Sequence, residues 1–95
     1  EVALGWYNLG LMQRRRGEIA AALDAYSRAL ALDPNNASCH QNRAVALLLG
    51  GDIDGARSAF RTAIALLEAQ GRPDEAQALR QQAGGIVKLN AEPFA

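Results

Sequence analysis

The sequence predicts an all-α fold made of repeated helical hairpins, with about five helices in total. Three observations lead to this prediction. The chain resembles itself after a shift of 34 residues, and self-similarity at a period of 20–50 residues is typical of repeat architectures. Apolar residues recur every three or four positions, as on one face of a helix. Hydrophobic residues make up 49% of the chain and aromatic residues only 5%, a composition rich in Ala and Leu that suits closely packed helices.

The 34-residue shift brings similar residues onto one another along most of two helical hairpins. Glycine meets glycine, small residues meet small residues, and an aromatic residue meets an aromatic residue. The pairs are Asn8 with Asn42, Gly17 with Gly51, Ile19 with Ile53, Ala22 with Ala56, Tyr26 with Phe60 and Ala29 with Ala63.

The first expected helix covers residues 3–16 and carries an apolar stripe at Ala3, Trp6, Leu9 and Gly10. Three arginines followed by Gly17 end it, since basic residues suit the negative end of the helix dipole and glycine is the usual stop signal. A glycine inside a helix costs about 1 kcal/mol relative to alanine. We therefore expect another helix to pack closely against Gly10.

The following helices are expected at residues 19–32, 37–49 and 53–70. Pro34 ends the first of these because it disfavours the helical conformation at Asp33, and Asn36 can cap the next. Small residues should let the two helices of each hairpin approach closely. Tyr26 and Phe60 should then fill the space between neighbouring hairpins.

The C-terminal part of the chain lacks the signature of a third hairpin. Pro73 suits the first turn of a helix over residues 74–83, which we interpret as a capping helix that bends or frays at Gly84 and Gly85. The chain is thus divided into a first hairpin (3–36), a second hairpin (37–70), a capping helix (71–89) and a disordered tail (90–95).

This pattern resembles the tetratricopeptide repeat, a 34-residue helix–turn–helix unit with W-x2-L-G-x2-Y, then A-x3-F, then P. The second copy is looser than the first, because His40, Arg43 and Leu47 stand where Trp, Leu and Tyr are expected. The resemblance covers residues 3–70 and implies a right-handed superhelical stack of helical hairpins. The first copy supplies Trp6, Leu9, Gly10, Ala22, Tyr26, Ala29 and Pro34, with Gln13 in place of an aromatic residue.

Composition argues against several classes of partner. Ten basic and ten acidic residues give a net charge of zero, so no overall field attracts nucleic acid or an anionic membrane. No apolar run approaches the length of a membrane span. The single cysteine, Cys39, suits a reducing compartment, and we expect a cytoplasmic protein. Because the chain begins at Glu1 without a methionine, we also expect either a piece of a longer protein or a processed chain.

No arrangement of residues points to catalysis, a metal or a cofactor. Cys39 and His40 are adjacent and would point about 100° apart on a helix, so they neither chelate one ion nor act as a nucleophile and its base. We interpret Cys39 as a buried small residue and His40 as structural. The sequence therefore predicts a protein that is not an enzyme and needs no cofactor.

The resemblance implies that the first helix of each hairpin lines a groove that binds a peptide or a partner helix. The helical wheel supports this, because Tyr7, Leu11 and Arg14 share a face that differs from the apolar stripe. Two alternatives remain: a neighbouring segment covers these residues, or they are ordinary exposed residues. The groove residues would be Leu4, Tyr7, Asn8, Leu11, Arg14 and Arg15 in the first hairpin, and Ser38, Gln41, Asn42, Val45, Leu48 and Leu49 in the second.

The sequence is compatible with two alternative functions, which belong to different classes. The first is a protein–protein interaction module whose peptide has apolar anchors and a flanking acidic residue that meets Arg14 and Arg15. The second is a structural segment of a longer helical solenoid, or an accessory to a catalytic domain, without a ligand of its own. Self-association is compatible with either.

Some co-chaperone members of the family hold a peptide's terminal carboxylates with Lys and Asn side chains. Asn42 stands where one such Asn would be, but Tyr7 and Leu11 stand where a Lys and another Asn would be needed. The sequence thus argues against that clamp. We expect Asn8 and Asn42 to form hydrogen bonds between helices.

Overall fold

The computed structural model describes residues 1–86, which contain five α-helices, a short helical segment at residues 84–86 and no strand. The prediction of an all-α helical-hairpin repeat is confirmed. The sequence-based helix ends differ from those in the structure by at most one residue. The helices are α1 (Val2–Arg15), α2 (Ile19–Leu32), α3 (Ala37–Leu49), α4 (Ile53–Ala69) and α5 (Pro73–Gln82). The expected tail at 90–95 and the last residues of the expected capping helix, 87–89, lie outside the described residues.

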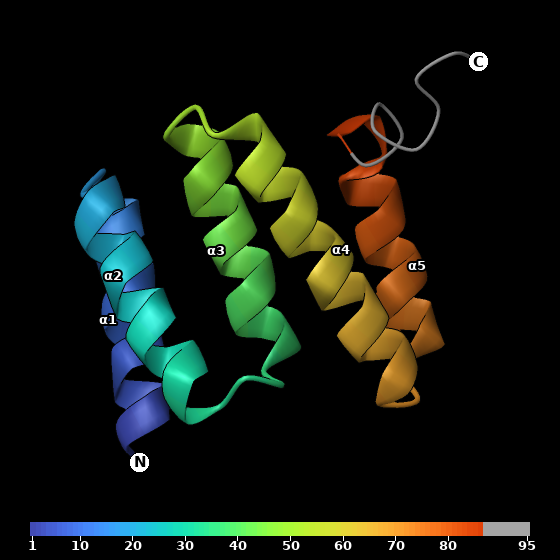
Figure 1. Cartoon of the computed structure of the whole chain (residues 1–95), viewed down its shortest axis with the longest axis horizontal. Helices are drawn as coiled ribbons and strands as arrows, with labels where there is room; N and C mark the ends of the chain where they lie inside the picture. Colours follow the sequence, from blue (N-terminus) through green and yellow to red (C-terminus); the bar gives the residue numbers. More distant parts are fainter. Residues whose placement is uncertain (87–95) are drawn as a thin grey trace.

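The helices stand side by side in a row that begins with α1 and α2 and ends with α5 (Figure 1). Each helix packs against the next along the chain, and α1 also contacts α3. The helices α1, α3 and α5 therefore follow one another along the stack as first members of successive pairs. The surface that they share is called the α1/α3/α5 surface below.

Local capping signals explain why the helix ends could be predicted so closely. After α1, Gly17 adopts a φ of +79°, and the next amide, Glu18 N–H, donates to the Gln13 carbonyl at 2.9 Å. This is the Schellman arrangement, which favours glycine in the left-handed conformation. Gly51 and Gly71 end α3 and α4 in the same way. At the start of α3, the Asn36 side chain accepts a hydrogen bond from Cys39 N–H at 3.0 Å.

The core of the first hairpin forms around Tyr26, whose side chain is fully buried. An added Cβ at Gly10 would lie 2.6 Å from Cε1 of the Tyr26 ring, a distance that no real methyl group tolerates. Gly10 is thus a glycine because the ring of Tyr26 lies against the α1 backbone. Cys39 and Ala46 of α3 belong to the same cluster, so the ring also fills the space between the hairpins, as predicted.

One part of the predicted stripe on α1 is wrong. Ala3 and Gly10 are buried as expected, and Trp6 is half-buried with the Arg28 guanidinium 4.9 Å from its ring centroid. Leu9, however, is 38% exposed. It lies on a side of α1 that no helix among residues 1–86 covers.

Candidate functional site

The centre of the α1/α3/α5 surface is a hydrogen-bonded bridge between the two hairpins. The Asn42 side chain on α3 donates from Nδ2 to the Tyr7 hydroxyl at 2.8 Å and to the Ser38 carbonyl at 2.9 Å. Its Oδ1 accepts a longer hydrogen bond, 3.4 Å, from Nη2 of Arg14 on α1. Asn42 therefore joins α3 to α1, as expected from the sequence. Asn8, in contrast, is exposed and makes no side-chain hydrogen bond within residues 1–86.

Burial governs the ionisation of the tyrosines beside this bridge. It raises the pKa of Tyr7, while the hydrogen bond from Asn42 and the charge of Arg14 oppose the shift. Burial likewise raises the pKa of Tyr26, with Arg14 again acting in the opposite direction. Both hydroxyls thus stay protonated at neutral pH. Tyr7 accepts a hydrogen bond from Asn42 and keeps its own proton for donation.

Two apolar side chains of the predicted groove also contribute to the core. Tyr7 and Leu11 pack against the buried cluster around Tyr26, and the Tyr7 and Tyr26 ring centroids are 6.2 Å apart. Tyr7 and Leu11 thus contribute to internal packing, although the sequence places them on a face of the helix that differs from the apolar stripe. The reason is that α3 lies beside α1 and encloses one side of both residues.

The remaining predicted groove residues differ in exposure. On α3, Val45 and Leu48 are half-buried and pack against the core of the second hairpin. Gln41, Asn42 and Arg14 are also half-buried, whereas the other members of the predicted set are exposed: Leu4, Asn8, Arg15, Ser38 and Leu49. The half-buried members thus lie along α1 and α3, and of the exposed members Ser38 contacts the bridge through its carbonyl and lines the pocket described below.

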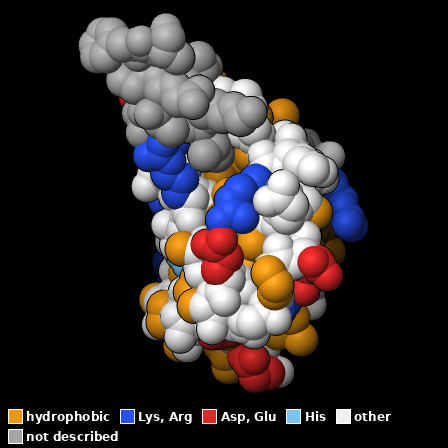
Figure 2. Space-filling view, turned by 90° about the vertical axis from the view of Figure 1, so that its right-hand side faces the viewer, with side chains coloured by type: hydrophobic (Ala, Val, Ile, Leu, Met, Phe, Trp, Pro, Cys, Tyr) orange, Lys and Arg blue, Asp and Glu red, His pale blue; other side chains and the backbone are white. Residues whose placement is uncertain are grey.

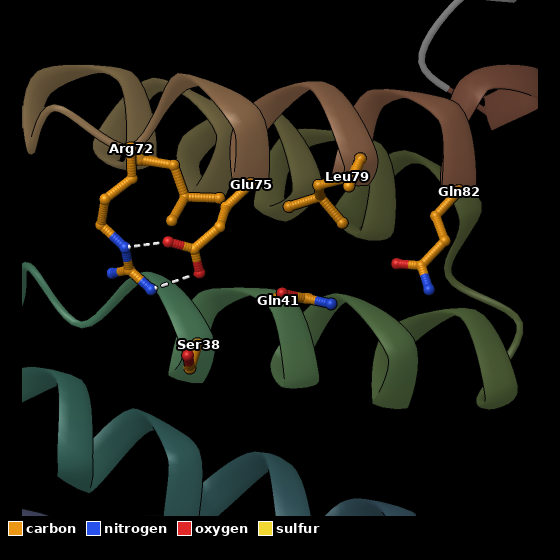
Figure 3. Close-up of a pocket in the computed structure, with 8 residues that line it drawn as sticks. Ser38, Gln41, Arg72, Glu75, Leu79 and Gln82 are labelled. Atoms are coloured by element: carbon orange, nitrogen blue, oxygen red, sulfur yellow. Dashed lines mark hydrogen bonds and ion pairs between the residues drawn. The ribbon is translucent and has the colours of Figure 1, made fainter.

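A pocket of about 210 Å³ lies between α3 and α5, next to this bridge. Figure 3 shows Gln41 of α3 facing Leu79 and Gln82 of α5 across it. Of its lining residues only Ser38 and Gln41 were predicted. The others come from α4, from α5 and from the turn between them: Leu67, Arg72, Glu75, Ala78, Leu79 and Gln82. They were missed because α5 was interpreted as a cap, although it occupies the next first-helix position in the stack.

An ion pair closes one end of the pocket. Arg72 donates from Nε and Nη2 to the two carboxylate oxygens of Glu75 at 2.6 and 2.7 Å (Figure 3). The hydrogen bonds raise the pKa of Arg72 and lower that of Glu75. The pair is electrically neutral as a unit. Leu67 and Leu79, both nearly fully buried, supply the apolar part of the lining.

Cys39 and His40, the two residues considered for catalysis or metal binding, both lie in surroundings typical of structural residues. Cys39 is fully buried, and burial raises its pKa to about 11, so the reactive thiolate is suppressed at neutral pH. The His40 ring lies 2.9 Å from the Pro34 carbonyl through Nε2. Within residues 1–86, no group of three or more His, Cys, Asp or Glu side chains is placed to hold a metal ion. None of the described helices is long and apolar enough to cross a membrane.

Comparison with known families identifies the repeat. Residues 3–36 match one family model described as tetratricopeptide repeat, and residues 25–78 match a second. The chain belongs to the tetratricopeptide repeat family. The second match covers more than half of the chain and runs from α2 into α5.

Relatives with this repeat come from distant organisms. Human tetratricopeptide repeat protein 36 is 36% identical over 63 residues, which cover 66% of this chain and 33% of the relative. A TPR repeat-containing protein of Synechococcus elongatus is 48% identical over an alignment of 117 residues, which covers 85% of this chain and 29% of the relative. The chain thus spans about a third of the length of these relatives.

A solved tetratricopeptide structure also resembles the whole chain. The first TPR of Spaghetti (RPAP3), bound to the HSP90 peptide SRMEEVD, superposes with a TM-score of 0.68 and 26% sequence identity. The match covers 99% of this chain and 84% of the solved one. Tetratricopeptide domains of this architecture thus support protein–protein interaction.

Proposed function

We propose that the α1/α3/α5 surface binds an extended peptide that has apolar anchor residues and a flanking Asp or Glu. The observation that carries this proposal is the group of hydrogen-bond donors on α1. Tyr7 keeps its hydroxyl proton, and the half-buried Arg14 directs its guanidinium toward the same bridge, where Nη2 lies 3.4 Å from Asn42 Oδ1. Neighbouring donors with a positive charge suit an acceptor such as a carboxylate.

The apolar component of the ligand follows from the surroundings of these donors. Leu11, Val45 and Leu48 are half-buried beside the bridge, so a ligand side chain can cover apolar surface there without displacing core residues. The α3/α5 pocket adds Leu67 and Leu79 beneath the amides of Gln41 and Gln82. Because the Arg72–Glu75 pair is neutral as a unit, this pocket suits an apolar side chain better than a charged one.

The peptide bound by the first TPR of Spaghetti has the same chemistry. It contains Met and Val as apolar residues and three acidic residues. In the present chain, however, Tyr7 and Leu11 replace the Lys and Asn of the terminal carboxylate clamp. We therefore infer that acidic side chains, rather than the C-terminal carboxylate, provide the main charge that this surface recognises.

The test is a fluorescence anisotropy titration with labelled SRMEEVD, its amidated form and the neutral analogue SRMQQVN. We expect saturable binding of SRMEEVD that weakens with added salt. Amidation should change the affinity little, whereas the neutral analogue should bind about tenfold more weakly. A large loss on amidation would instead indicate a terminal carboxylate clamp and contradict the inference.

Matched variants identify the binding surface. Tyr7→Ala with Leu11→Ala should weaken binding by removing apolar contacts and one donor. Arg14→Glu with Arg15→Glu should weaken binding and reduce its salt dependence. The control, Arg16→Glu with Arg28→Glu, changes the net charge equally but lies away from the bridge. Circular dichroism must show that each variant folds.

Two results would overturn the proposal. Affinity that is indifferent to both the reversal of Arg14 and Arg15 and the salt concentration would leave these arginines as a solvated helix end. Absence of saturable binding by SRMEEVD, and by a panel of heptapeptides that combine Leu, Met or Val with Asp or Glu, would favour a structural segment without a ligand.

A further inference from the structure

Glu75 lies on the side of α5 that belongs to the α1/α3/α5 surface. Because the chain repeats after 34 residues, Tyr7, Gln41 and Glu75 stand at equivalent positions of α1, α3 and α5. Ser38 and Arg72 are equivalent in the same way. These four residues of α3 and α5 all line the α3/α5 pocket. Figure 3 shows the side chains of Arg72 and Glu75 extending from α5 toward α3, so their ion pair is part of the surface itself.

The Arg72 guanidinium presents to Glu75 the edge that suits a carboxylate. Its Nε and Nη2 donate to the two oxygens of Glu75 at 2.6 and 2.7 Å, and bidentate pairs of this kind are strong and geometrically specific. The third nitrogen, Nη1, donates to Gln70 Oε1 at 3.2 Å, while Gln70 Nε2 donates to the Asn35 carbonyl at 2.7 Å. Gln70 thus orients the guanidinium by a contact that does not involve Glu75.

A purely structural role explains this pair less well. Negative charge in the first turn favours a helix, but Asp74 also supplies such a charge there, and Pro73 already suits the start of α5. The side chains of Arg72 and Glu75 are 39% and 57% exposed, and ion pairs this exposed contribute little to stability. The larger effect of the pair is on the pocket, because Glu75 turns a cationic group of donors into a neutral unit.

Recognition of a carboxylate at this end of the surface depends on direct hydrogen bonds. Seen from the α5 end of the stack, acidic and basic side chains are interspersed on the surface, and no broad basic patch would attract an acidic ligand (Figure 2). Among the described residues that line the pocket, Arg72 alone is basic. Its Nε–Nη2 edge is already occupied by Glu75.

We propose that Glu75 is a specificity-determining residue, which excludes acidic ligand side chains from the α3/α5 pocket by occupying the Nε and Nη2 donors of Arg72. An incoming carboxylate would have to displace that of Glu75 and lie beside it, and like charges at such short range repel. The acidic residue of the ligand meets Arg14 and the Tyr7 hydroxyl instead. Glu75 thereby sets the direction of the peptide, with an apolar residue toward α5. This proposal rests on the proposed peptide binding at the same surface.

A fluorescence anisotropy titration of the 95-residue chain with labelled SRMEEVD tests the role of Glu75. Glu75→Gln removes the charge but keeps the size of the side chain, and Gln suits the same position near a helix start. We expect the dissociation constant to fall about three- to tenfold in this variant, because Arg72 becomes available to an acidic residue of the peptide. The gain should be absent with the neutral analogue SRMQQVN and should shrink with added salt.

Asp74→Asn is the matched control. It removes the same charge from the neighbouring position, which does not line the pocket, so an effect of net charge alone would appear equally in both variants. Adding Arg72→Gln to Glu75→Gln should cancel the gain. The nitrogen-15 resonance of Arg72 Nε gives a separate readout, because it should move on addition of SRMEEVD in Glu75→Gln and stay in place in wild type. Circular dichroism must show that each variant folds.

The outcomes separate this proposal from the peptide binding on which it rests. Wild type that binds SRMEEVD with an affinity that Glu75→Gln leaves unchanged, or changes no more than Asp74→Asn does, would overturn the role of Glu75 alone. The same conclusion would follow if the Arg72 Nε resonance moved equally in wild type and Glu75→Gln, since the ligand would then displace Glu75. Absence of saturable binding by wild type and by every variant would overturn both proposals.

Discussion

Replacement of Gly10 by alanine tests the packing of the first hairpin with a single methyl group. Alanine favours the helix by about 1 kcal/mol over glycine, so propensity alone predicts stabilisation. The added Cβ, however, would lie 2.6 and 2.7 Å from Cε1 and Cδ1 of Tyr26. The ring is fully buried and can move only by disturbing its neighbours. Overpacking of this kind costs about 1–3 kcal/mol, and more in tight sites.

We therefore expect Gly10→Ala to lower the free energy of unfolding by up to about 2 kcal/mol after the gain in propensity is subtracted. For a domain of this size, each kcal/mol corresponds to a shift of about 4–8 °C in the melting temperature. The matched control is Gly5→Ala in the same helix, where no atom lies near the new methyl group. It should be stabilising by about 0.5–1 kcal/mol.

Urea denaturation of the two variants measures the sign and size of each change in the free energy of unfolding. A close contact between Gly10 and the Tyr26 ring requires opposite signs for the two substitutions. A double-mutant cycle with Tyr26→Leu should show that the penalty at Gly10 shrinks when the ring is absent. Equal stabilisation by both alanines would refute the close contact between α1 and the Tyr26 ring.

Three further changes test other parts of the structure. Tyr26→Ala should cost about 3–5 kcal/mol because the ring is fully buried, and an unchanged melting curve would show that the ring is exposed. Asn42→Ala should cost about 1 kcal/mol because it removes the bridge between hairpins, whereas Asn8→Ala should stay within about 0.5 kcal/mol of wild type. The pKa of Cys39 is raised from 9.0 to about 11 in the folded state. The stability that the thiol contributes is present below pH 9 and is lost as the pH rises toward about 11, because the unfolded chain ionises first. Denaturation curves across this range should therefore fall more steeply for wild type than for Cys39→Ala, and parallel curves would contradict the shift.

The helix boundaries were predictable because they depend on local chemistry. Gly17 and Gly51 adopt left-handed conformations, Asn36 caps α3 and Pro73 opens α5. Each of these residues signals a helix end without reference to distant parts of the chain. The repeat of 34 residues then implied how neighbouring hairpins stack.

The misjudged features depend on contacts between residues far apart in the sequence. Tyr7 looked free of the core because its partners lie far along the chain: its ring packs against Tyr26 of α2, and its hydroxyl accepts a hydrogen bond from Asn42 of α3. Leu9 looked internal because its family position is a packing position, yet no described helix covers that side of α1. The pocket beside Gln41 was not predicted because it depends on how far α5 stands from α3. The spacing of residues along the chain does not determine the distance between these two helices.

The central claim, that a peptide binds along the α1/α3/α5 surface, is tested most directly by a nitrogen-15 chemical-shift titration with SRMEEVD. We expect the largest changes at backbone amides around Tyr7, Leu11, Gln41 and Asn42, with further changes on α5 near Leu79. Amides on the solvent-facing sides of α2 and α4 should change little. Changes that are concentrated on α2 and α4, or spread evenly over the molecule, would contradict the claim.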